Sequence, residues 1–336
     1  MRIMENKKKN VKRKFEDFLK KKGGEDDLFQ KIYELEDYLD NFVDEAEQGL
    51  GLQLLSSAGN EVKIKDRTNK VQNAIMLGSN SYLNLTTHPR VVEASIEATK
   101  KYGYGMGAVS LYAGITDLHR ELENIISEFH GTEDTIIFPS GYGTNVGVIS
   151  ALCRKGDVII NDSANHASIF DGCLLSGADI KIYPHNKMEL LEHVLSRLPK
   201  EQKGRLIITD GVFSMHGDLA PLDEIVRLAE KYEAKLMVDD AHGIGIVGPT
   251  GRGTAEAFGV EDKIDINVGM LSKSPGGLGG YCTGKKNLIS FLRLYSRTYF
   301  FSTAMPASIV AGLIEIFKMF IEDKAGRKQL WENIDY

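Results

Sequence analysis

The sequence contains little cysteine. Its three cysteines among 336 residues, Cys153, Cys173 and Cys282, are odd in number, widely spaced and outside any CxxC pair. This pattern argues against a disulfide framework and a structural zinc site, so we expect no metal site and a reducing, cytoplasmic environment. No apolar run approaches the roughly 20 residues that a membrane-spanning helix requires. No apolar segment followed by a small-residue cleavage site appears at the N-terminus. We therefore expect neither a transmembrane segment nor a secretory signal.

Basic residues are also in the minority. The chain has 41 lysines and arginines against 47 aspartates and glutamates, a formal net charge of −6. Nucleic-acid-binding proteins usually show a basic balance or a concentrated basic face, so we expect no nucleic-acid partner. The hydrophobic fraction of 42% and the charged fraction of 26% are those of an ordinary globular protein. The length suffices for one large domain and a smaller appendage.

The first part of the chain differs in composition from the rest, and we expect residues 1–74 to form an N-terminal arm of one basic and one acidic helix. Residues 1–25 include KKK runs at 7–9 and 20–22, and their apolar residues fall at helical spacing. A basic amphipathic helix of this kind either lies on a membrane surface or serves as a solvated or dimer-packing arm. Residues 27–48 show the pattern of an acidic amphipathic helix.

From about residue 75 onward, short apolar runs alternate with amphipathic segments. Runs typical of strands lie at 135–138, 158–160, 180–183, 206–209, 236–238 and 264–268. Helical patterns lie between them near 142–153, 187–198 and 221–232. Strands that are apolar on both faces and separated by helices predict an α/β fold with a mainly parallel sheet covered by helices on both faces. We expect this large domain to span residues 75–305, with 306–336 as the start of a C-terminal domain.

Polar residues follow several predicted strands at the point where each strand ends. They lie at 239–242, at 210–214, at 165–168 and at 272–273. In open parallel sheets, ligand-binding groups gather at the carboxyl ends of the strands. We therefore expect these side chains to share one edge of the sheet.

Among these residues, Lys273 and Asp239 indicate cofactor chemistry. A lysine that forms a Schiff base must lose a proton from its amine, and the backbone beside it must approach a bulky ring closely. A position among serines and glycines suits such a lysine. An aspartate at a buried strand end can hold a pyridinium nitrogen protonated. Gly141 and Gly143 open a helix whose N-terminal amides can bind a phosphate. Taken singly, these features fit other readings: a surface lysine, a metal site at Asp-Asp-Ala-His, or an aspartate that caps a helix.

The motifs and their order resemble those of the α-oxoamine synthase family, fold-type-I enzymes that use pyridoxal 5'-phosphate (PLP). The motifs are GSNSYLNL at 78–85, GITDLHRELE at 114–123, FPSGYGTN at 138–145, DSANHAS at 162–168, TDGVFSMHGD at 209–218, VDDAHGIGIVGPTGRG at 238–253 and LSKSPGGLGGY at 271–281. The resemblance covers about residues 75–320. The TDGVFSM and VDDAHG blocks, followed by the lysine loop, are its most specific part.

The resemblance implies how PLP is held and used. Lys273 would form the Schiff base with the cofactor, and Asp239 would pair with the ring nitrogen. His166 would stack on the face of the ring. His242 and Ser214 would lie near the phenolic oxygen of the ring.

The same resemblance implies contacts at the borders of the site. Gly141 and Tyr142 correspond to the phosphate-binding loop, and Asn80 corresponds to an asparagine near the carboxylate of the amino-acid substrate. Ser302 and Thr303, in the segment FSTAMP, resemble residues that reach the phosphate of the neighbouring subunit. A homodimer is therefore implied.

The implied reaction is a decarboxylative condensation of an amino acid (glycine, alanine or serine) with an acyl-CoA thioester, which yields an α-amino ketone. The alternatives are another reaction on the same fold, such as that of an aminotransferase or lyase, and an inactive PLP-binding partner subunit. Met270 departs from the family pattern, which usually has a threonine on the phosphate there. Family members usually continue as a small α/β domain, which implies that the C-terminal small domain is largely missing here.

Overall fold

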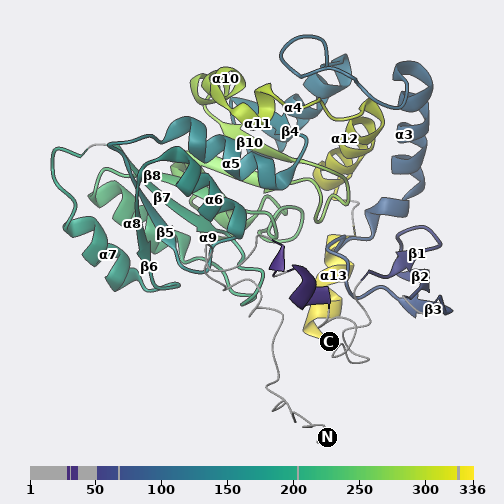
Figure 1. Cartoon of the computed structure of the whole chain (residues 1–336), viewed down its shortest axis with the longest axis horizontal. Coiled ribbons are helices and arrows are strands. Elements are labelled where there is room, and N and C mark those ends of the chain that lie inside the picture. The colour runs from purple at the N-terminus through teal and green to yellow at the C-terminus, as the bar shows by residue number, and fades with distance from the viewer. Residues whose placement is uncertain (1–28, 31, 37–50, 67–68, 203, 324–325) are drawn as a thin grey trace, which may run out of the picture. The chain divides into compact units, whose positions relative to one another are not determined.

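The structure, a computed structural model, describes residues 29–30, 32–36, 51–66, 69–202, 204–323 and 326–336 (Figure 1). The chain divides into two compact units. The smaller comprises Met1–Ser57 and Glu61–Ile75, and the larger comprises Ala58–Asn60 and Met76–Tyr336. Within the described ranges, no helix has both the length and the apolar character needed to cross a membrane.

The smaller unit contains a three-stranded antiparallel sheet in the order β1-β2-β3, formed by Gln53–Leu54, Glu61–Lys65 and Val71–Ile75. Val62 and Ile64 of β2 are buried, and their neighbours along the strand are not. This period of two belongs to a strand rather than a helix. The expectation of a helical arm over residues 1–74 is therefore wrong for these strands.

The helices expected nearer the N-terminus are mostly not described. The basic helix expected within residues 1–25 lies outside the described residues. Of the acidic stretch 27–48, the structure describes only 29–30 and 32–36, and residues 30 and 32–36 are helical.

The larger unit is built on a seven-stranded sheet in the order β4-β10-β9-β8-β7-β5-β6. The strands are β4 (Asp134–Phe138), β5 (Val158–Asp162), β6 (Asp179–Tyr183), β7 (Arg205–Asp210), β8 (Lys235–Asp239), β9 (Ile266–Met270) and β10 (Gly280–Gly284). The pairs β5–β6, β5–β7, β7–β8 and β8–β9 are parallel, whereas β10 is antiparallel to both β4 and β9. The mainly parallel sheet is confirmed, and the antiparallel strand β10 is an addition that the sequence reasoning missed.

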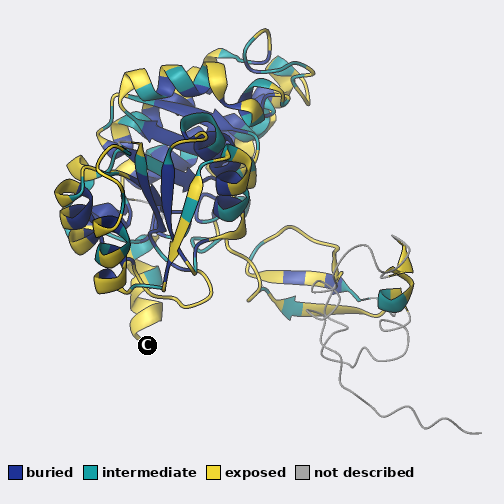
Figure 2. Ribbon diagram, turned by 60° about the vertical axis from the view of Figure 1, so that its left-hand side comes forward, coloured by how far each residue is buried: buried dark blue, intermediate teal, exposed yellow. Residues whose placement is uncertain are grey.

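Helices connect and cover these strands. They are α3 (Pro89–Tyr102), α4 (Asp117–His130), α5 (Gly141–Leu152), α6 (Ala167–Ser176), α7 (Met188–Ser196), α8 (Leu222–Lys231), α9 (Thr254–Phe258), α10 (Lys286–Tyr295), α11 (Arg297–Phe300), α12 (Ala307–Ile321) and α13 (Arg327–Asp335), with short 3₁₀ turns η2 (Leu85–Thr87) and η3 (Glu261–Lys263). Ile207 of β7 packs in a hydrophobic cluster with residues of α7 and α8, and Ile208 packs in another with residues of α5 and α6. Because successive side chains of a strand point to opposite faces, helices cover the sheet on both sides. Figure 2 shows the buried strands between partly exposed helices.

A third hydrophobic cluster lies beside β4 and β10. It joins residues of α4 and α12 to Ile137 and Tyr281. Helix α12 begins just beyond the boundary expected at 305 and belongs to the same compact unit as the sheet. That residues 306–336 open a further domain stays a prediction.

Candidate active site

A pocket of about 290 Å³ lies at the carboxyl ends of β7, β8 and β9. It is lined by Ser140, Gly141, Tyr142, His166, Ser168, Asp210, Val212, Ser214, Asp239, Ala241, His242, Met270, Ser272, Lys273, Leu278 and Gly279. This is the edge at which open α/β sheets bind their ligands. The gathering of polar groups expected from the strand ends is therefore present in the folded chain.

Asp239 is the last residue of β8 and is almost completely buried. Its Oδ2 accepts a hydrogen bond from Asn145 Nδ2 at 2.6 Å, and its Oδ1 accepts one from the Ala241 amide at 3.1 Å. Burial raises the pKa of the Asp239 carboxyl, and these two hydrogen bonds oppose the rise. A cationic group in the pocket would stabilise the ionised form of this carboxylate further.

The neighbouring Asp240 serves a different purpose. Its carboxylate accepts hydrogen bonds from the amide and the hydroxyl of Thr254. A Cβ atom added at Gly211, Gly243 or Gly253 would come within 2.4 Å of an Asp240 oxygen, so three glycines leave room for this carboxylate. Burial raises its pKa to about 6. Asp240 does not line the pocket and instead ties the loop after β8 to α9.

His166 is the N-cap of α6, and its Nδ1 accepts a hydrogen bond from the Ser168 amide at 3.3 Å. Nδ1 also lies 2.7 Å from the Ser168 hydroxyl, which accepts a hydrogen bond from Asn145 Nδ2 at 2.9 Å. One chain of hydrogen bonds therefore runs from His166 through Ser168 and Asn145 to Asp239. The sequence placed Ser168, of the DSANHAS motif, at this edge without a role, and it did not single out Asn145, although Asn145 lies in the FPSGYGTN motif.

His242 is held by a residue from a distant part of the sequence. Its Nδ1 lies 2.6 Å from the Tyr82 hydroxyl, which also donates to Asn80 Oδ1 at 3.3 Å. Burial lowers the pKa of His242 to about 4, with the Lys273 charge adding to the effect, so the ring is neutral near pH 7. Asn80 does not itself line the pocket and reaches it through Tyr82, which the sequence reasoning did not single out.

Lys273 follows β9 in a tight turn, in which the Gly276 amide donates to the Lys273 carbonyl at 2.7 Å. Gly276 takes a φ of 68°, and an added Cβ would meet Thr86 Cγ2 at 2.8 Å. The turn thus requires glycine for both its backbone conformation and its close packing. It directs Lys273 into the pocket with Asp239 and His242.

The start of α5 forms another side of the pocket. Ser140 caps this helix by accepting a hydrogen bond from the Gly143 amide at 3.2 Å. A Cβ added at Gly141 would lie 2.4 Å from Met270 Sδ, so a larger residue does not fit there. Helix N-termini attract anions through their free amides and the helix dipole. Gly141 and Tyr142 therefore stand where an anionic group would be favoured, with Met270 beside them.

Ser302 and Thr303 do not line this pocket, and Thr303 instead forms an antiparallel bridge with Val109. Asp210, which the sequence placed at this edge without a role, lines the pocket, and its buried Oδ1 has no hydrogen-bond partner among the described residues. Burial, with repulsion from Asp239 on the adjacent strand, raises the pKa of Asp210 well above its usual value.

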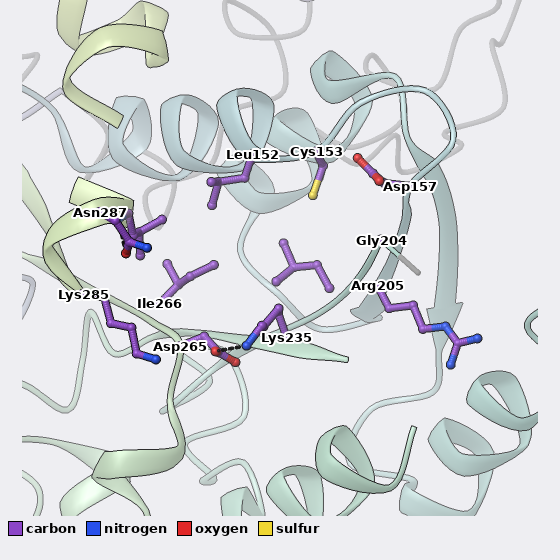
Figure 3. Close-up of a pocket in the computed structure, with 12 residues that line it drawn as sticks. Leu152, Cys153, Asp157, Gly204, Arg205, Lys235, Asp265, Ile266, Lys285 and Asn287 are labelled. Carbon is purple, nitrogen blue, oxygen red and sulfur yellow. Dashed lines mark hydrogen bonds and ion pairs between the residues drawn. The ribbon is translucent and has the colours of Figure 1, made fainter. Parts of the chain in front are cut away.

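A larger pocket, of about 440 Å³, lies at the opposite edge of the sheet, where β5, β7, β8 and β9 begin (Figure 3). Two of its charged residues, Lys235 and Arg205, are engaged within the fold. Lys235 pairs with Asp265 at 2.7 Å, and the Arg205 guanidinium donates to three backbone carbonyls. Among the described residues that line it, this pocket has no histidine, unlike the pocket at the carboxyl edge, where β7, β8 and β9 end.

This chain is similar to proteins of a known family. The model of the family described as aminotransferase class I and II matches residues 72–336. The 8-amino-7-oxononanoate synthase of Thermoanaerobacter pseudethanolicus is 50% identical over 262 residues, which cover 78% of this chain and 66% of that protein. The 8-amino-7-oxononanoate synthase 1 of Bacillus subtilis is 47% identical, with coverage of 79% and 67%. The chain thus spans about two thirds of the length of these curated relatives.

Solved structures of related enzymes have the same fold as this chain. Serine palmitoyltransferase of Sphingomonas wittichii superposes with a TM-score of 0.84 at 37% identity, covering 92% of this chain and 76% of that one. A structure of serine palmitoyltransferase described as carrying a PLP internal aldimine superposes equally well, with a TM-score of 0.84 at 36% identity and the same coverage. The chain belongs to the α-oxoamine synthase family within the aminotransferase class I and II proteins.

Proposed function

We propose that this protein is a PLP-dependent acyltransferase that condenses an amino acid with an acyl-CoA thioester, with loss of CO₂, to give an α-amino ketone. The observation that carries the proposal is the pocket at the carboxyl edge, which brings together Lys273, Asp239, His166 and His242. The relatives named as 8-amino-7-oxononanoate synthases and serine palmitoyltransferases support the same reaction class.

The residues of the pocket fit PLP. The cofactor has a basic ring nitrogen, a phenolic oxygen, an aldehyde and a phosphate. The buried Asp239 suits the ring nitrogen, and the start of α5 at Gly141 suits the phosphate. The buried, unpartnered Asp210 Oδ1 is a further sign that a polar ligand completes this pocket.

When bound, PLP supplies an electron sink that stabilises negative charge at the α-carbon of an amino acid. Lys273 Nζ would hold the cofactor covalently and then, once the amino-acid substrate displaces it, take the proton from the α-carbon. Asp239 would keep the ring nitrogen protonated, and Asn145 would keep the Asp239 carboxylate in position. His166 would cover one face of the ring.

Further residues would orient the cofactor and the substrate. The neutral His242 and the Ser214 hydroxyl would hydrogen-bond the phenolic oxygen, and Tyr82 would fix the orientation of the His242 ring. Gly141 and Tyr142 would bind the phosphate. The candidate amino acids are glycine, alanine and serine.

We also propose a homodimer in the cytoplasm. Ser302 and Thr303 lie outside the pocket of their own chain, which is consistent with a role in the pocket of a second copy. The three cysteines are all free and buried, which suits a reducing compartment. Sedimentation of the PLP-loaded protein tests the assembly, and a fully active monomer would contradict it.

The reaction is tested with the purified, PLP-loaded protein. We expect a yellow protein whose visible spectrum changes on titration with glycine, alanine or serine. A screen of acyl-CoA thioesters should then give release of free CoA that depends on the amino acid. Amino-group transfer to an oxo acid without CoA release would point instead to an aminotransferase. Cofactor binding without any turnover would point to an inactive partner subunit.

A further inference from the structure

A short hairpin after β7 presents two metal-ligating side chains outside the pocket. Val212 and Leu219 form an antiparallel bridge, and the Phe213 amide donates to the Asp218 carbonyl at 3.0 Å. At its tip, Gly217 takes a φ of 75°, which closes the turn. The hairpin carries His216 and Asp218, both exposed.

The loop after β6 places a third ligating side chain against this hairpin. His185 Nε2 lies 3.0 Å from Asp218 Oδ2, and the rings of His185 and His216 are 4.6 Å apart between centroids. The ligand atoms of His185, His216 and Asp218 all lie within 4.8 Å of one another. Over the part of the chain that the structure describes, no other three histidines, cysteines or carboxylates gather in this way.

A buried carboxylate fixes the orientation of the His185 ring from behind. His185 Nδ1 lies 3.1 Å from Oδ1 of Asp162, the last residue of β5, which is fully buried. Asp162 also accepts hydrogen bonds from the Ala164 and Asn186 amides, at 2.8 Å and 3.0 Å. An acceptor at Nδ1 requires that nitrogen to carry the proton, which leaves Nε2 to bind a proton or a cation. Metal-ligating histidines typically have such a carboxylate on their other ring nitrogen.

We propose that His185, His216 and Asp218 form a site for one divalent transition-metal cation such as Zn²⁺. Two imidazoles and one carboxylate are a ligand set that suits zinc and its neighbours, with a further position left for water. Ligands at about 2.0–2.2 Å from a tetrahedral zinc lie about 3.3 Å from one another. The 3.0 Å between His185 Nε2 and Asp218 Oδ2 is close to that value, and the ligand atom of the exposed His216 lies within 4.8 Å of both.

The cation would be bound at defined atoms. His185 Nε2 and one Asp218 oxygen would bind it, while His185 Nδ1 donates its hydrogen bond to Asp162. Asn186 Nδ2, which donates to Asp218 Oδ2 at 3.0 Å, holds this carboxylate toward His185.

The cluster is separate from the proposed cofactor site, since none of its three ligands lines that pocket. Val212 and Ser214, earlier in the same hairpin, do line it. The cysteine pattern predicts no structural zinc site, and this cluster uses no cysteine. Its ligands come from two segments about 30 residues apart, a separation beyond the spacings of the familiar zinc motifs.

The test is equilibrium dialysis of the PLP-loaded full chain against Zn²⁺ at micromolar concentration, with bound zinc counted by atomic absorption. The variants are His216→Asn and Asp218→Asn, both at exposed positions. The control is His193→Asn, an exposed histidine outside the cluster. Zinc held by the cofactor itself would be the same in all four proteins, so the difference between them isolates the cluster.

We expect one saturable Zn²⁺ per chain in the wild type and the control, and at least a tenfold loss of affinity in both cluster variants. Co²⁺ bound at the site should give visible bands that disappear in His216→Asn. Equal zinc binding in the wild type and the cluster variants would overturn the proposal, as would the absence of saturable binding in the wild type. Neither outcome depends on turnover.

Discussion

The two edges of the central sheet each have a pocket, and the two pockets differ in what their polar groups do. At the amino edge, where β5, β7, β8 and β9 begin, Lys235 is paired with Asp265, and Arg205 donates to backbone carbonyls. These charges therefore stabilise the fold. At the carboxyl edge, Lys273 and Asp239 face one cavity, and the buried Asp210 Oδ1 has no partner among the described residues. The larger volume belongs to the amino edge. Convergent, incompletely satisfied polar groups therefore mark the candidate site better than size does.

Replacing the lysine at each edge should give the largest contrast. Lys273→Ala removes the only side chain proposed to bind the cofactor covalently, so it should abolish turnover and the visible absorption of the bound cofactor. Lys235→Ala, at the amino edge, loses one exposed ion pair and should keep both the turnover and the visible absorption of the bound cofactor. Spectra and CoA-release rates measure this. Full turnover in Lys273→Ala would show that the central assignment is wrong.

The aspartates at the end of β8 should separate catalysis from structure. Asp239→Asn keeps the size but removes the charge, so exchange of the substrate α-proton should slow by several orders of magnitude, a loss of at least a few kcal/mol. The cofactor should still bind, because Lys273 and Gly141 are unchanged. Proton exchange followed by NMR measures the effect. If Asp240→Asn is crippling and Asp239→Asn is mild, the two roles are reversed.

Asp240 should instead affect stability in a pH-dependent way. Its folded pKa of about 6 lies above the unfolded value of 3.8, so its favourable contribution is complete below pH 3.8 and is lost as the pH rises through 6. The loss amounts to about 3 kcal/mol. Relative to the wild type, Asp240→Asn should therefore gain about that much unfolding free energy between pH 4 and pH 7. Urea unfolding at several pH values measures this difference in unfolding free energy. A difference that does not change with pH would contradict the raised pKa of the buried Asp240 carboxyl.

Tyr82→Phe should have a smaller effect at the carboxyl edge. It removes the hydroxyl 2.6 Å from His242 Nδ1 and leaves the aromatic ring in place. One hydrogen bond of this kind is worth about 1 kcal/mol, so kcat/KM should fall about three- to tenfold. Tyr104→Phe, at a tyrosine that is 91% exposed, is the matched control. Identical kinetics in the two variants would show that Tyr82 does not orient His242.

Lys285→Ala should have the smallest effect. This exposed residue lines the larger pocket at the amino edge. Because that edge has no proposed role in the reaction, kcat and KM should both stay within about twofold, the usual range for a surface change. Steady-state kinetics measure them. A large change in either constant would mean that the amino edge contributes to function after all.

The sequence by itself determined the α/β sheet and much of its reactive edge. Strands that are apolar on both faces, such as Leu206–Thr209, can be stable only between two layers of helices. The polar residues directly after them, including Asp239 and His242, then had to meet at one edge. The predicted strand at 264–268 placed Lys273 at the same edge. The strands β1 to β3 were missed because the basic and acidic helical patterns before them were extended too far.

Only the tertiary structure decided which side chains touch. Tyr82 meets His242 across 160 residues, and Asn145 meets Asp239 across 94. The cluster of His185, His216 and Asp218 likewise depends on two loops from neighbouring parts of the sheet. Periodicity records which face of an element is buried, but it does not record the order of strands in the sheet. That order, including the antiparallel β10, determines which residues become neighbours.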